Sequence, residues 1–356
     1  MHRQASVAVL SADENLAAFT AQVLTSHSPT AITLLDVNSL GKSSPNTPAP
    51  SSAVTTHVFL PVRHSDFQPP HMGAFINWGA NCTLLVIDSS QGIDSTTVSL
   101  MLVAMRHHPA IIAVTGLDNA RSHFDETVAV CQRVFGTDRQ IVALSLPVLD
   151  ESESVQGTLN LLTETIQWRN AAGHFEEHDL DAEHYELIDT RFDELTNALA
   201  ITTENDAFAH ELLEGSSLDA QILHSELLGA IRSLELIPVM PISGDVGLTE
   251  LIALLQEVGV DIPNEWSPFS PSYPDEPIAS VIADGMVRVW HGNLTAGDFM
   301  FEDQPGQVTS LATIGGGAIS HATCSSIYRA NLVPDCEPGT TISISGSALT
   351  IPEESP

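Results

Sequence analysis

The sequence predicts an α/β domain with a mostly parallel sheet, an inserted helical or α+β subdomain, and a small antiparallel β-barrel towards the carboxyl end. Three observations support this prediction. Short apolar strands alternate with helical segments of about 12 residues through the first half of the chain, which favours right-handed crossovers and parallel strands. An acidic, helix-patterned stretch interrupts that alternation. After a proline-rich segment, apolar and polar residues alternate between Gly, Asn and Asp turns, as in short antiparallel strands.

The first domain is expected over residues 1–265. It begins with a buried strand in ASVAVL, and further strands are expected in THVFLPV, CTLLVID, AIIAVTGLD, QIVALSLPV and LIPVMPISG. Helices are expected in TVSLMLVAM, DETVAVCQRVF and GLTELIALLQEV, and Asp94 is expected to cap the first of these. In a parallel sheet with helices on both faces, ligands bind at the carboxyl ends of the strands, so a functional site is expected there.

The insertion in this domain is expected over about residues 146–234. Its acidic part, from Asp150 to Leu234, is patterned as helix without a clear strand until its end. The stretch 266–275 is rich in proline and is expected to be a linker. Residues 276–351 are expected to form the β-barrel, because they contain the alternating segments IASVIADGMVRVWHGNLTAGDFMFED and GTTISISG.

The charge of the chain excludes one broad class of function. The 356 residues include 45 acidic and 12 basic ones, the net charge is −33, and Lys42 is the only lysine. Such a surface repels phosphate backbones at long range, so DNA binding is not expected and any RNA contact must be a small local patch. A high net charge also serves solubility alone, without any partner.

Neither a membrane segment nor an export signal is visible in the sequence. The longest apolar stretch, MLVAMRHHPAIIAV, is shorter than the roughly 18 to 20 residues of a membrane span, and it contains Arg106. The apolar segment at the amino terminus is too short for a signal peptide, and acidic residues follow it directly. We therefore expect a cytoplasmic protein whose four cysteines, which form no CxxC pair, are reduced thiols.

One group of histidines has the composition of a metal site. His174, His178 and His184 lie in HFEEHDLDAEH among several carboxylates, and helical spacing would place His174 and His178 on one face. The alternative is an exposed acidic helix or loop. Because the spacing matches no zinc motif, we expect no metal at this position.

Several segments, taken together, resemble the front part of bacterial elongation factor G. In chain order they are LLVIDSSQGID, AIIAVTGLDNARSHF, LSLPVLDESESVQGTLNLLTETIQW, LLEGSSLD and LIPVMPISGDVGLTELIALL. They are similar to the GTPase domain of that family with its inserted subdomain, and VRVWHGNLTAGD resembles the start of the second, β-barrel domain. The resemblance implies a P-loop-NTPase-like fold for the first domain. Since the chain ends before the family's third to fifth domains, we expect it not to perform translocation.

Translational GTPases bind phosphate with a glycine-rich loop, a lysine and a magnesium-binding hydroxyl. The resemblance aligns the family's AHIDAGKT with LSADENLA of this chain. Asp13 is retained, but Asn15 replaces the glycine, Leu16 replaces the lysine and Ala17 replaces the hydroxyl. A glutamate between Asp13 and Asn15 adds a carboxylate where phosphate would lie. The alignment therefore predicts a degenerate phosphate loop.

A second phosphate-facing motif of the family, DTPGH, is also altered. Its aspartate supports Mg²⁺ and its histidine positions the attacking water, according to the resemblance. The corresponding stretch is FLPVRH, residues 59–64, in which only Pro61 stays in register. His64 lies one position along from the catalytic histidine, but a histidine without phosphate or metal contacts cannot hydrolyse GTP. No catalytic residue is therefore expected, with His64 as the one candidate.

Guanine is bound in the family by NKxD, whose aspartate accepts hydrogen bonds from the base, and by an SA dipeptide whose backbone contacts the base oxygen. The counterparts here are TGLD, which ends at Asp118, and Ser243–Gly244. Asp118, Ser243 and Gly244 are thus the candidate residual guanine site. An aspartate after a buried strand is also a common helix N-cap, so a purely structural role for Asp118 stays open.

The resemblance leads to two hypotheses of function. The first is a truncated pseudo-GTPase of translation, without a cofactor, that acts by binding the ribosome or another translation component. The second is a divergent GTP-binding translation factor with GTPase activity, which uses Asp118 and Ser243 for the base and binds GTP or GDP with Mg²⁺. A small-molecule enzyme on the same sheet is a third class, for which the sequence offers no set of nucleophile, base and orienting group.

Overall fold

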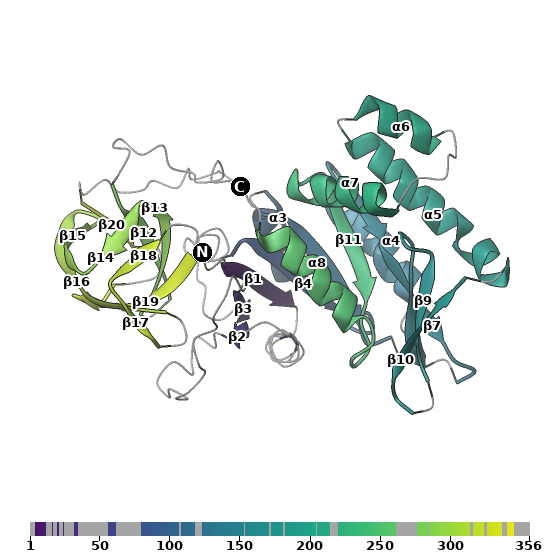
Figure 1. Cartoon of the computed structure of the whole chain (residues 1–356), viewed down its shortest axis with the longest axis horizontal. Helices are drawn as coiled ribbons and strands as arrows, with labels where there is room; N and C mark the ends of the chain where they lie inside the picture. The colour runs from purple at the N-terminus through teal and green to yellow at the C-terminus, as the bar shows by residue number, and fades with distance from the viewer. Residues whose placement is uncertain are drawn as a thin grey trace. The chain divides into compact units, whose positions relative to one another are not determined.

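The structure is a computed structural model, drawn as a cartoon in Figure 1. It describes residues 4–11, 16, 20, 24, 32–34, 56–61, 80–106, 108–117, 123–152, 154–170, 172–180, 182–203, 205–213, 220–260, 276–283, 285–313, 316–323, 326–336 and 340–344. The chain divides into two compact units, one built mainly from residues 82–258 and the other mainly from the regions before and after it. The predicted domain boundaries at 265 and 275 lie outside the described residues and stay predictions.

A seven-stranded sheet has the order β2-β3-β1-β4-β5-β11-β6. Its strands are β1 (Gln4–Ser11), β2 (Ile32–Leu34), β3 (Thr56–Pro61), β4 (Cys82–Asp88), β5 (Ala110–Thr115), β6 (Gln140–Ala143) and β11 (Leu236–Pro241). The pairs β2–β3, β4–β5, β5–β11 and β11–β6 are parallel. The predicted mostly parallel sheet is confirmed, and β2 is a strand that the sequence did not indicate.

The central strands are buried apolar runs covered by helices. Every residue of β11 is buried, as is every residue except the last in β4 and in β5. Burial of both faces explains why these strands show no alternation of apolar and polar residues. The helices connected to them are α3 (Ser95–Met105), α4 (Phe124–Phe135), α7 (Ala220–Arg232) and α8 (Leu248–Val260). Asp94 caps α3, as predicted, by accepting a hydrogen bond from the Thr97 amide at 2.7 Å.

The insertion begins where the chain passes from one sheet into the next. β6 ends at Ala143 and β7 starts at Ser145, and the Leu144 amide between them still donates to the carbonyl of Val239 in β11. The second sheet is antiparallel and has the order β10-β9-β8-β7 (Figure 1). Its strands are β7 (Ser145–Leu149), β8 (Val155–Asn160), β9 (Thr165–Arg169) and β10 (Phe175–Asp179). Helices α5 (Ala182–Thr202) and α6 (Asp206–Leu213) follow, and α7 leads back to β11.

The strands β8, β9 and β10 correct a prediction, because Asp150–Leu234 was expected to be helical until its end. The turns that connect these strands contain Glu164 and Gly173 in the left-handed conformation, with φ of 52° and 83°. β10 has the sequence FEEHD, and four of its five residues are exposed. An apolar pattern could not reveal such a strand, since charged side chains occupy both of its faces. The insertion is therefore α+β, with its helices in the second half.

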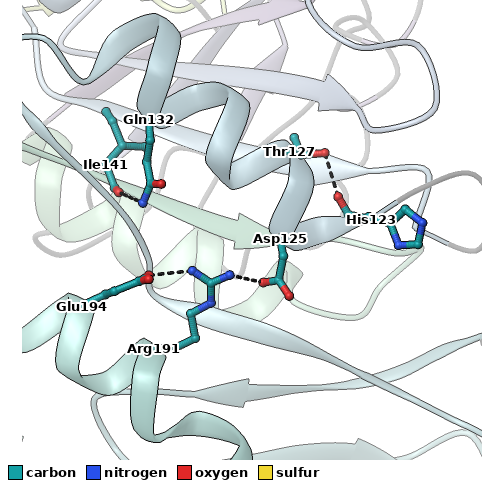
Figure 2. Close-up of polar contacts among 7 residues, drawn as sticks. All are labelled: His123, Asp125, Thr127, Gln132, Ile141, Arg191 and Glu194. Atoms are coloured by element: carbon teal, nitrogen blue, oxygen red, sulfur yellow. Dashed lines mark hydrogen bonds and ion pairs between the residues drawn. The ribbon is translucent and has the colours of Figure 1, made fainter.

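Helix α5 of the insertion is tied to α4 of the main domain by an ion pair (Figure 2). Arg191 Nη2 lies 2.7 Å from Asp125 Oδ1, and Arg191 Nη1 donates to Glu194 Oε2 at 2.6 Å. On α4, Gln132 Nε2 donates to the carbonyl of Ile141 in β6 at 3.0 Å. Polar contacts therefore connect α4 both to the edge strand of the sheet and to the insertion.

The carboxyl-terminal region contains the predicted barrel. Six antiparallel strands follow one another in the order β15-β20-β12-β13-β19-β16, and the pairing of β15 with β16 closes the ring. The strands are β12 (Ile278–Ala283), β13 (Met286–His291), β15 (Gly297–Phe301), β16 (Gln304–Ala312), β19 (Ser326–Val333) and β20 (Thr341–Ser343). β17 (Ala318–Ile319) adds to β16, and β14 (Asn293–Thr295) pairs with β18 (His321–Thr323). Alternate residues of the strands, among them Val287 and Val289, form the buried core.

None of the helices in the described part of the chain combines the length and the apolar character of a membrane span.

Candidate functional site

The loops that follow β4, β5 and β11 lie side by side at one edge of the parallel sheet. The Ser89 amide donates to the carbonyl of Thr115 at 3.0 Å. The Ile242 amide donates to the carbonyl of Val114 at 2.8 Å. These two hydrogen bonds continue the parallel ladders beyond the strands. The edge expected to hold the site is therefore formed by the carboxyl ends of three neighbouring strands.

The carboxylate of Asp88, at the end of β4, is bound by its own loop. Oδ1 accepts hydrogen bonds from the amide and the hydroxyl of Ser90, at 2.9 and 2.6 Å. Oδ2 accepts one from Gln91 Nε2 at 3.0 Å. The main-chain carbonyl of Asp88 accepts from the amides of Gln91 and Gly92. Because both carboxylate oxygens already have donors, Asp88 stabilises this turn by local side-chain hydrogen bonds.

Gly116 lies directly against that carboxylate. This glycine is the counterpart of the lysine in the family's NKxD motif. It has φ of 72°, a left-handed conformation that residues with a Cβ rarely adopt. A Cβ built at this position would overlap Asp88 Oδ1. The position therefore admits glycine and excludes any side chain as long as the loop after β4 keeps its present form.

The second candidate motif, Ser243–Gly244, forms a closed turn after β11. Ser243 and Val246 exchange two main-chain hydrogen bonds, of 3.2 and 2.9 Å. Between them, Gly244 has φ of 60°, and no described atom lies within 4 Å of the place that a Cβ would take. Gly247 follows, with φ of 79°, and packs tightly against the Pro241 carbonyl. Gly244 is thus exposed within a hydrogen-bonded turn at the edge of the sheet.

The insertion contacts this turn through charged side chains. Arg169, at the end of β9, forms an ion pair with Asp245, which lies between Gly244 and Val246. The Arg169 guanidinium also lies over the ring of Phe175 in β10, 5.6 Å from its centroid, as in a cation–π contact. A Cβ at Gly247 would be 3.5 Å from Thr158 Cγ2 in β8. The antiparallel sheet of the insertion therefore packs against the loop after β11.

A buried carboxyl group follows in the first turn of α8. Burial raises the pKa of Glu250, while Asn160, Thr158 and Ser145 of the insertion lower it to a smaller extent. Among the described residues, Glu250 Oε2, Ser145 Oγ and Thr158 Oγ1 have no partner at full hydrogen-bond geometry. The Glu250 carboxyl therefore packs against polar side chains of β7 and β8 with incomplete hydrogen bonding. Incomplete pairing is what makes burial of its charged form unfavourable.

Most of the residues predicted for a nucleotide site lie outside the described residues: Asp13, Asn15, Ala17, His64 and Asp118. Leu16 is described, as a half-buried helical residue. Ser243 and Gly244 are described, and the ladders place them beside the end of β5, which lies three positions before Asp118 in the sequence. The degenerate phosphate loop and the role of Asp118 as base ligand or helix cap stay predictions.

The histidine-rich stretch forms strand β10 and the start of helix α5 rather than one helix, so the expected helical pairing of His174 and His178 is wrong. His174 precedes β10, His178 lies within it, and His184 falls in the separate helix α5. His178 Nε2 is 3.7 Å from Glu176 Oε2, and both side chains are more than half exposed. Within the described ranges, no group of three or more His, Cys, Asp or Glu side chains could hold a metal ion.

Three residues of this region were not named from the sequence: Asp88, Arg169 and Glu250. Asp88 had a usable signal, because it is the polar residue that ends the apolar run CTLLVID. Arg169 had none, since its partner Asp245 lies 76 residues further along the chain. Glu250 is one of 45 acidic residues, and only packing against the insertion distinguishes it.

Comparison with known proteins tests the resemblance. No known family profile matches the chain. Over 173 residues it is 25% identical to the elongation factor G-like protein of Mycobacterium tuberculosis, in the strains CDC 1551 / Oshkosh and ATCC 25618 / H37Rv. That stretch is 48% of this chain but only 23% of the relatives' length.

A crystal structure of a protein from Thermus thermophilus has the same fold. The TM-score is 0.71 at 18% identity, over 98% of this chain and 56% of that protein. The alignment therefore includes the parallel sheet, the insertion and the closed barrel of this chain. The sequence relatives support the resemblance of the chain to elongation factor G-like proteins, and the solved structure supports the fold.

Proposed function

We propose that this protein is a pseudo-GTPase of translation, which uses an elongation factor G-like fold to bind the ribosome or another translation component and does not hydrolyse GTP. The proposal includes a cytoplasmic location and no bound cofactor. The sequence relatives and the fold support the family-level part of it. The loss of nucleotide binding is supported by the sequence of the phosphate loop and by the geometry of the guanine motif.

The observation that carries the proposal is the contact between Asp88 and Gly116. The resemblance aligns Gly116 with the lysine of NKxD, and a Cβ at this position would overlap the Asp88 carboxylate as that side chain now lies. The space is taken by a carboxylate that is held by Ser90 and Gln91. This internal contact between the ends of β4 and β5 supports loss of the lysine's role in base binding.

Local charge supports the same proposal. β4 ends at Asp88, the loop after it contains Asp94, and the loop after β11 contains Asp245. The only lysine of the sequence, Lys42, belongs to neither loop. Because Arg169 pairs with Asp245, the carboxylates that a triphosphate would meet at the end of β4 are those of Asp88 and Asp94, where a phosphate site needs cations and main-chain amides.

Isothermal titration of the purified protein with GTP and with GDP, in the presence of Mg²⁺, tests the first part. We expect no binding with a dissociation constant below about 1 mM. Asp118→Asn is titrated in parallel, with Asp303→Asn on an exposed turn of the barrel as the charge-matched control. Binding of GDP at micromolar strength that Asp118→Asn abolishes and Asp303→Asn keeps would overturn the pseudo-GTPase proposal.

Co-sedimentation with ribosomes tests the second part. We expect the protein to pellet with ribosomes in the absence of nucleotide and to be unaffected by added GTP or GDP. Because the net charge of −33 makes loose attraction to RNA improbable, a complex retained at about 0.2 M salt would indicate specific contacts. Absence from the pellet at all salt concentrations would exclude the ribosome and leave a free translation component as the partner.

A divergent GTP-binding factor is the second candidate, and one observation favours it. Gly244 is exposed in the turn after β11, and no described atom lies within 4 Å of the place that a Cβ would take there. Such a turn is able to offer an amide to a base oxygen. The titration with Asp118→Asn distinguishes the two candidates, and a positive result would make a GTPase assay the next measurement.

A further inference from the structure

The turn after β11 is contacted by a side chain of the insertion as well as by its own main chain. It spans Ser243–Gly247 and closes on itself through the two main-chain hydrogen bonds between Ser243 and Val246. Asp245 is the one charged side chain in this turn, and its partner Arg169 comes from the end of β9. The chain between them contains the rest of the insertion, so this ion pair joins two distant parts of the sequence.

Arg169 is held in place from its other side. Its guanidinium stacks on Phe175, its neighbour in the β9–β10 pairing, where the register sets Phe175 opposite Arg169. Its carboxylate partner is about one-third exposed, as is Arg169 itself. The guanidinium is thus fixed by the antiparallel sheet before it meets Asp245, which lowers the entropy lost in forming the ion pair.

Two further contacts join the insertion to the same region. Thr158 of β8 lies next to Gly247 at the end of the turn. Glu250, in the first turn of α8, faces Ser145, Thr158 and Asn160. These contacts hold the start of α8 against the sheet of the insertion. The Arg169–Asp245 pair contacts the turn itself, because Asp245 lies between the hydrogen-bonded residues Ser243 and Val246.

We propose that Arg169 is a positioning residue through which the inserted subdomain holds the Ser243–Gly247 turn in its closed form. A partner that shifts the β9–β10 hairpin would thereby loosen this turn, and a ligand held by the turn would restrain the hairpin. The link to a ligand rests on the function proposed above, but the mechanical coupling is a property of the free protein. It is therefore testable without any nucleotide or ribosome.

Hydrogen exchange of the full chain, without ligand, measures the closed turn directly. The amides of Ser243 and Val246 are protected only while the turn is closed, and a peptide that covers residues 242–248 reports them. In Arg169→Gln and in Asp245→Asn, we expect exchange of these amides to rise about two- to fivefold, as for loss of a partly exposed ion pair. The double variant should be no faster than either single one, since both remove the same contact.

Two matched variants make the result specific. Arg191→Gln breaks the other ion pair between the insertion and the main domain, at Asp125, and should leave exchange of the turn unchanged. The charge reversal Arg169→Asp with Asp245→Arg should restore protection at least in part, which loss of packing alone would not allow. Exchange rates are measured at the same number of degrees below the unfolding temperature of each variant. A general loss of stability then does not contribute to the difference between variants.

The proposal is overturned if Arg169→Gln and Asp245→Asn leave the exchange of Ser243 and Val246 unchanged, or if Arg191→Gln raises it equally. Should Arg169→Gln fail to fold, Asp245→Asn decides the question alone, because it removes the charge without touching the insertion sheet. A failure here leaves the pseudo-GTPase proposal intact, and nucleotide binding in the titration leaves the exchange result standing.

Discussion

Arg191 of α5 and Asp125 of α4 form an ion pair with 2.7 Å between Nη2 and Oδ1, across 66 residues of sequence (Figure 2). Burial lowers the pKa of Arg191, but hydrogen bonding to Glu194 and the charge of Asp125 raise it more, so the guanidinium stays charged. Asp125 lies in the first turn of α4, the helix that follows the candidate base-binding loop. The insertion thus contacts the helix that follows the candidate base-binding loop in sequence.

Removal of this ion pair should have a small effect on stability. Asp125 is 70% exposed and Arg191 22%, so solvent screens much of the interaction. We expect Arg191→Gln to lower the free energy of unfolding by about 0.2 to 1 kcal/mol at low salt. Urea unfolding at about 0.05 and about 0.5 M NaCl checks this, and the difference between wild type and variant should shrink at the higher salt. A loss that is independent of salt would show that packing of the Arg191 stem matters more than its charge.

A side chain at Gly116 should be strongly unfavourable. Gly116→Ala combines a left-handed backbone with overlap of Asp88, and we expect a loss of roughly 2 to 4 kcal/mol in the free energy of unfolding. The matched control is Gly244→Ala, which is also left-handed, with φ of 60°, but has open space around it. That control should lose only about 1 kcal/mol. Equal losses for the two variants in urea unfolding would contradict the close contact between Gly116 and Asp88.

Glu250 should make the protein less stable as the pH rises. Its pKa in the folded protein is raised above the ordinary value of 4.5, mainly by burial. The folded state therefore holds a proton that the unfolded state releases, and stability falls from about pH 4.5 upward through the raised pKa. Glu250→Gln removes this dependence, because a neutral amide has no proton to lose.

We accordingly expect Glu250→Gln to unfold at a higher temperature than wild type at about pH 7, with the difference shrinking towards about pH 4. The control Glu211→Gln, on an exposed face of α6, should show no such trend. Thermal unfolding followed by circular dichroism at several pH values measures both. A variant that is less stable than wild type at neutral pH would show that the Glu250 carboxylate is stabilised by its neighbours instead.

Arg139 should contribute more to stability than an ordinary surface arginine. Its Nε donates to the Leu234 carbonyl at 2.7 Å, and its Nη2 donates to the Met105 carbonyl at 2.5 Å. These carbonyls lie at the end of α3 and in the turn between α7 and β11, where helix ends leave acceptors without intrahelical donors. We expect Arg139→Gln to lower the free energy of unfolding by roughly 2 kcal/mol.

Arg133→Gln, on the exposed side of α4, is the matched control and should change stability by less than about 0.5 kcal/mol. Urea denaturation of both variants gives the comparison. If Arg139→Gln behaved like Arg133→Gln, water would be an adequate donor for both carbonyls.

Local sequence patterns determined much of the architecture. The apolar runs CTLLVID, AIIAVTGLD and LIPVMPISG predicted strands that are now found as β4, β5 and β11, because strands buried on both faces must be apolar throughout. Alternation of apolar and polar residues predicted the barrel, since each strand has one inner and one outer face. The loss of the phosphate-loop residues is likewise a sequence property, as it depends only on which side chains are present.

The tertiary structure alone decided what lies against the candidate base motifs. β8, β9 and β10 escaped prediction because an exposed, charged strand such as FEEHD has no apolar face to reveal its period. The contact of Asp88 with Gly116 and the ion pair of Arg169 with Asp245 join residues 28 and 76 positions apart. Sequence patterns report on neighbours within a helix or strand, whereas such contacts depend on how strands are ordered in the sheets, and that order is set by packing of the whole domain.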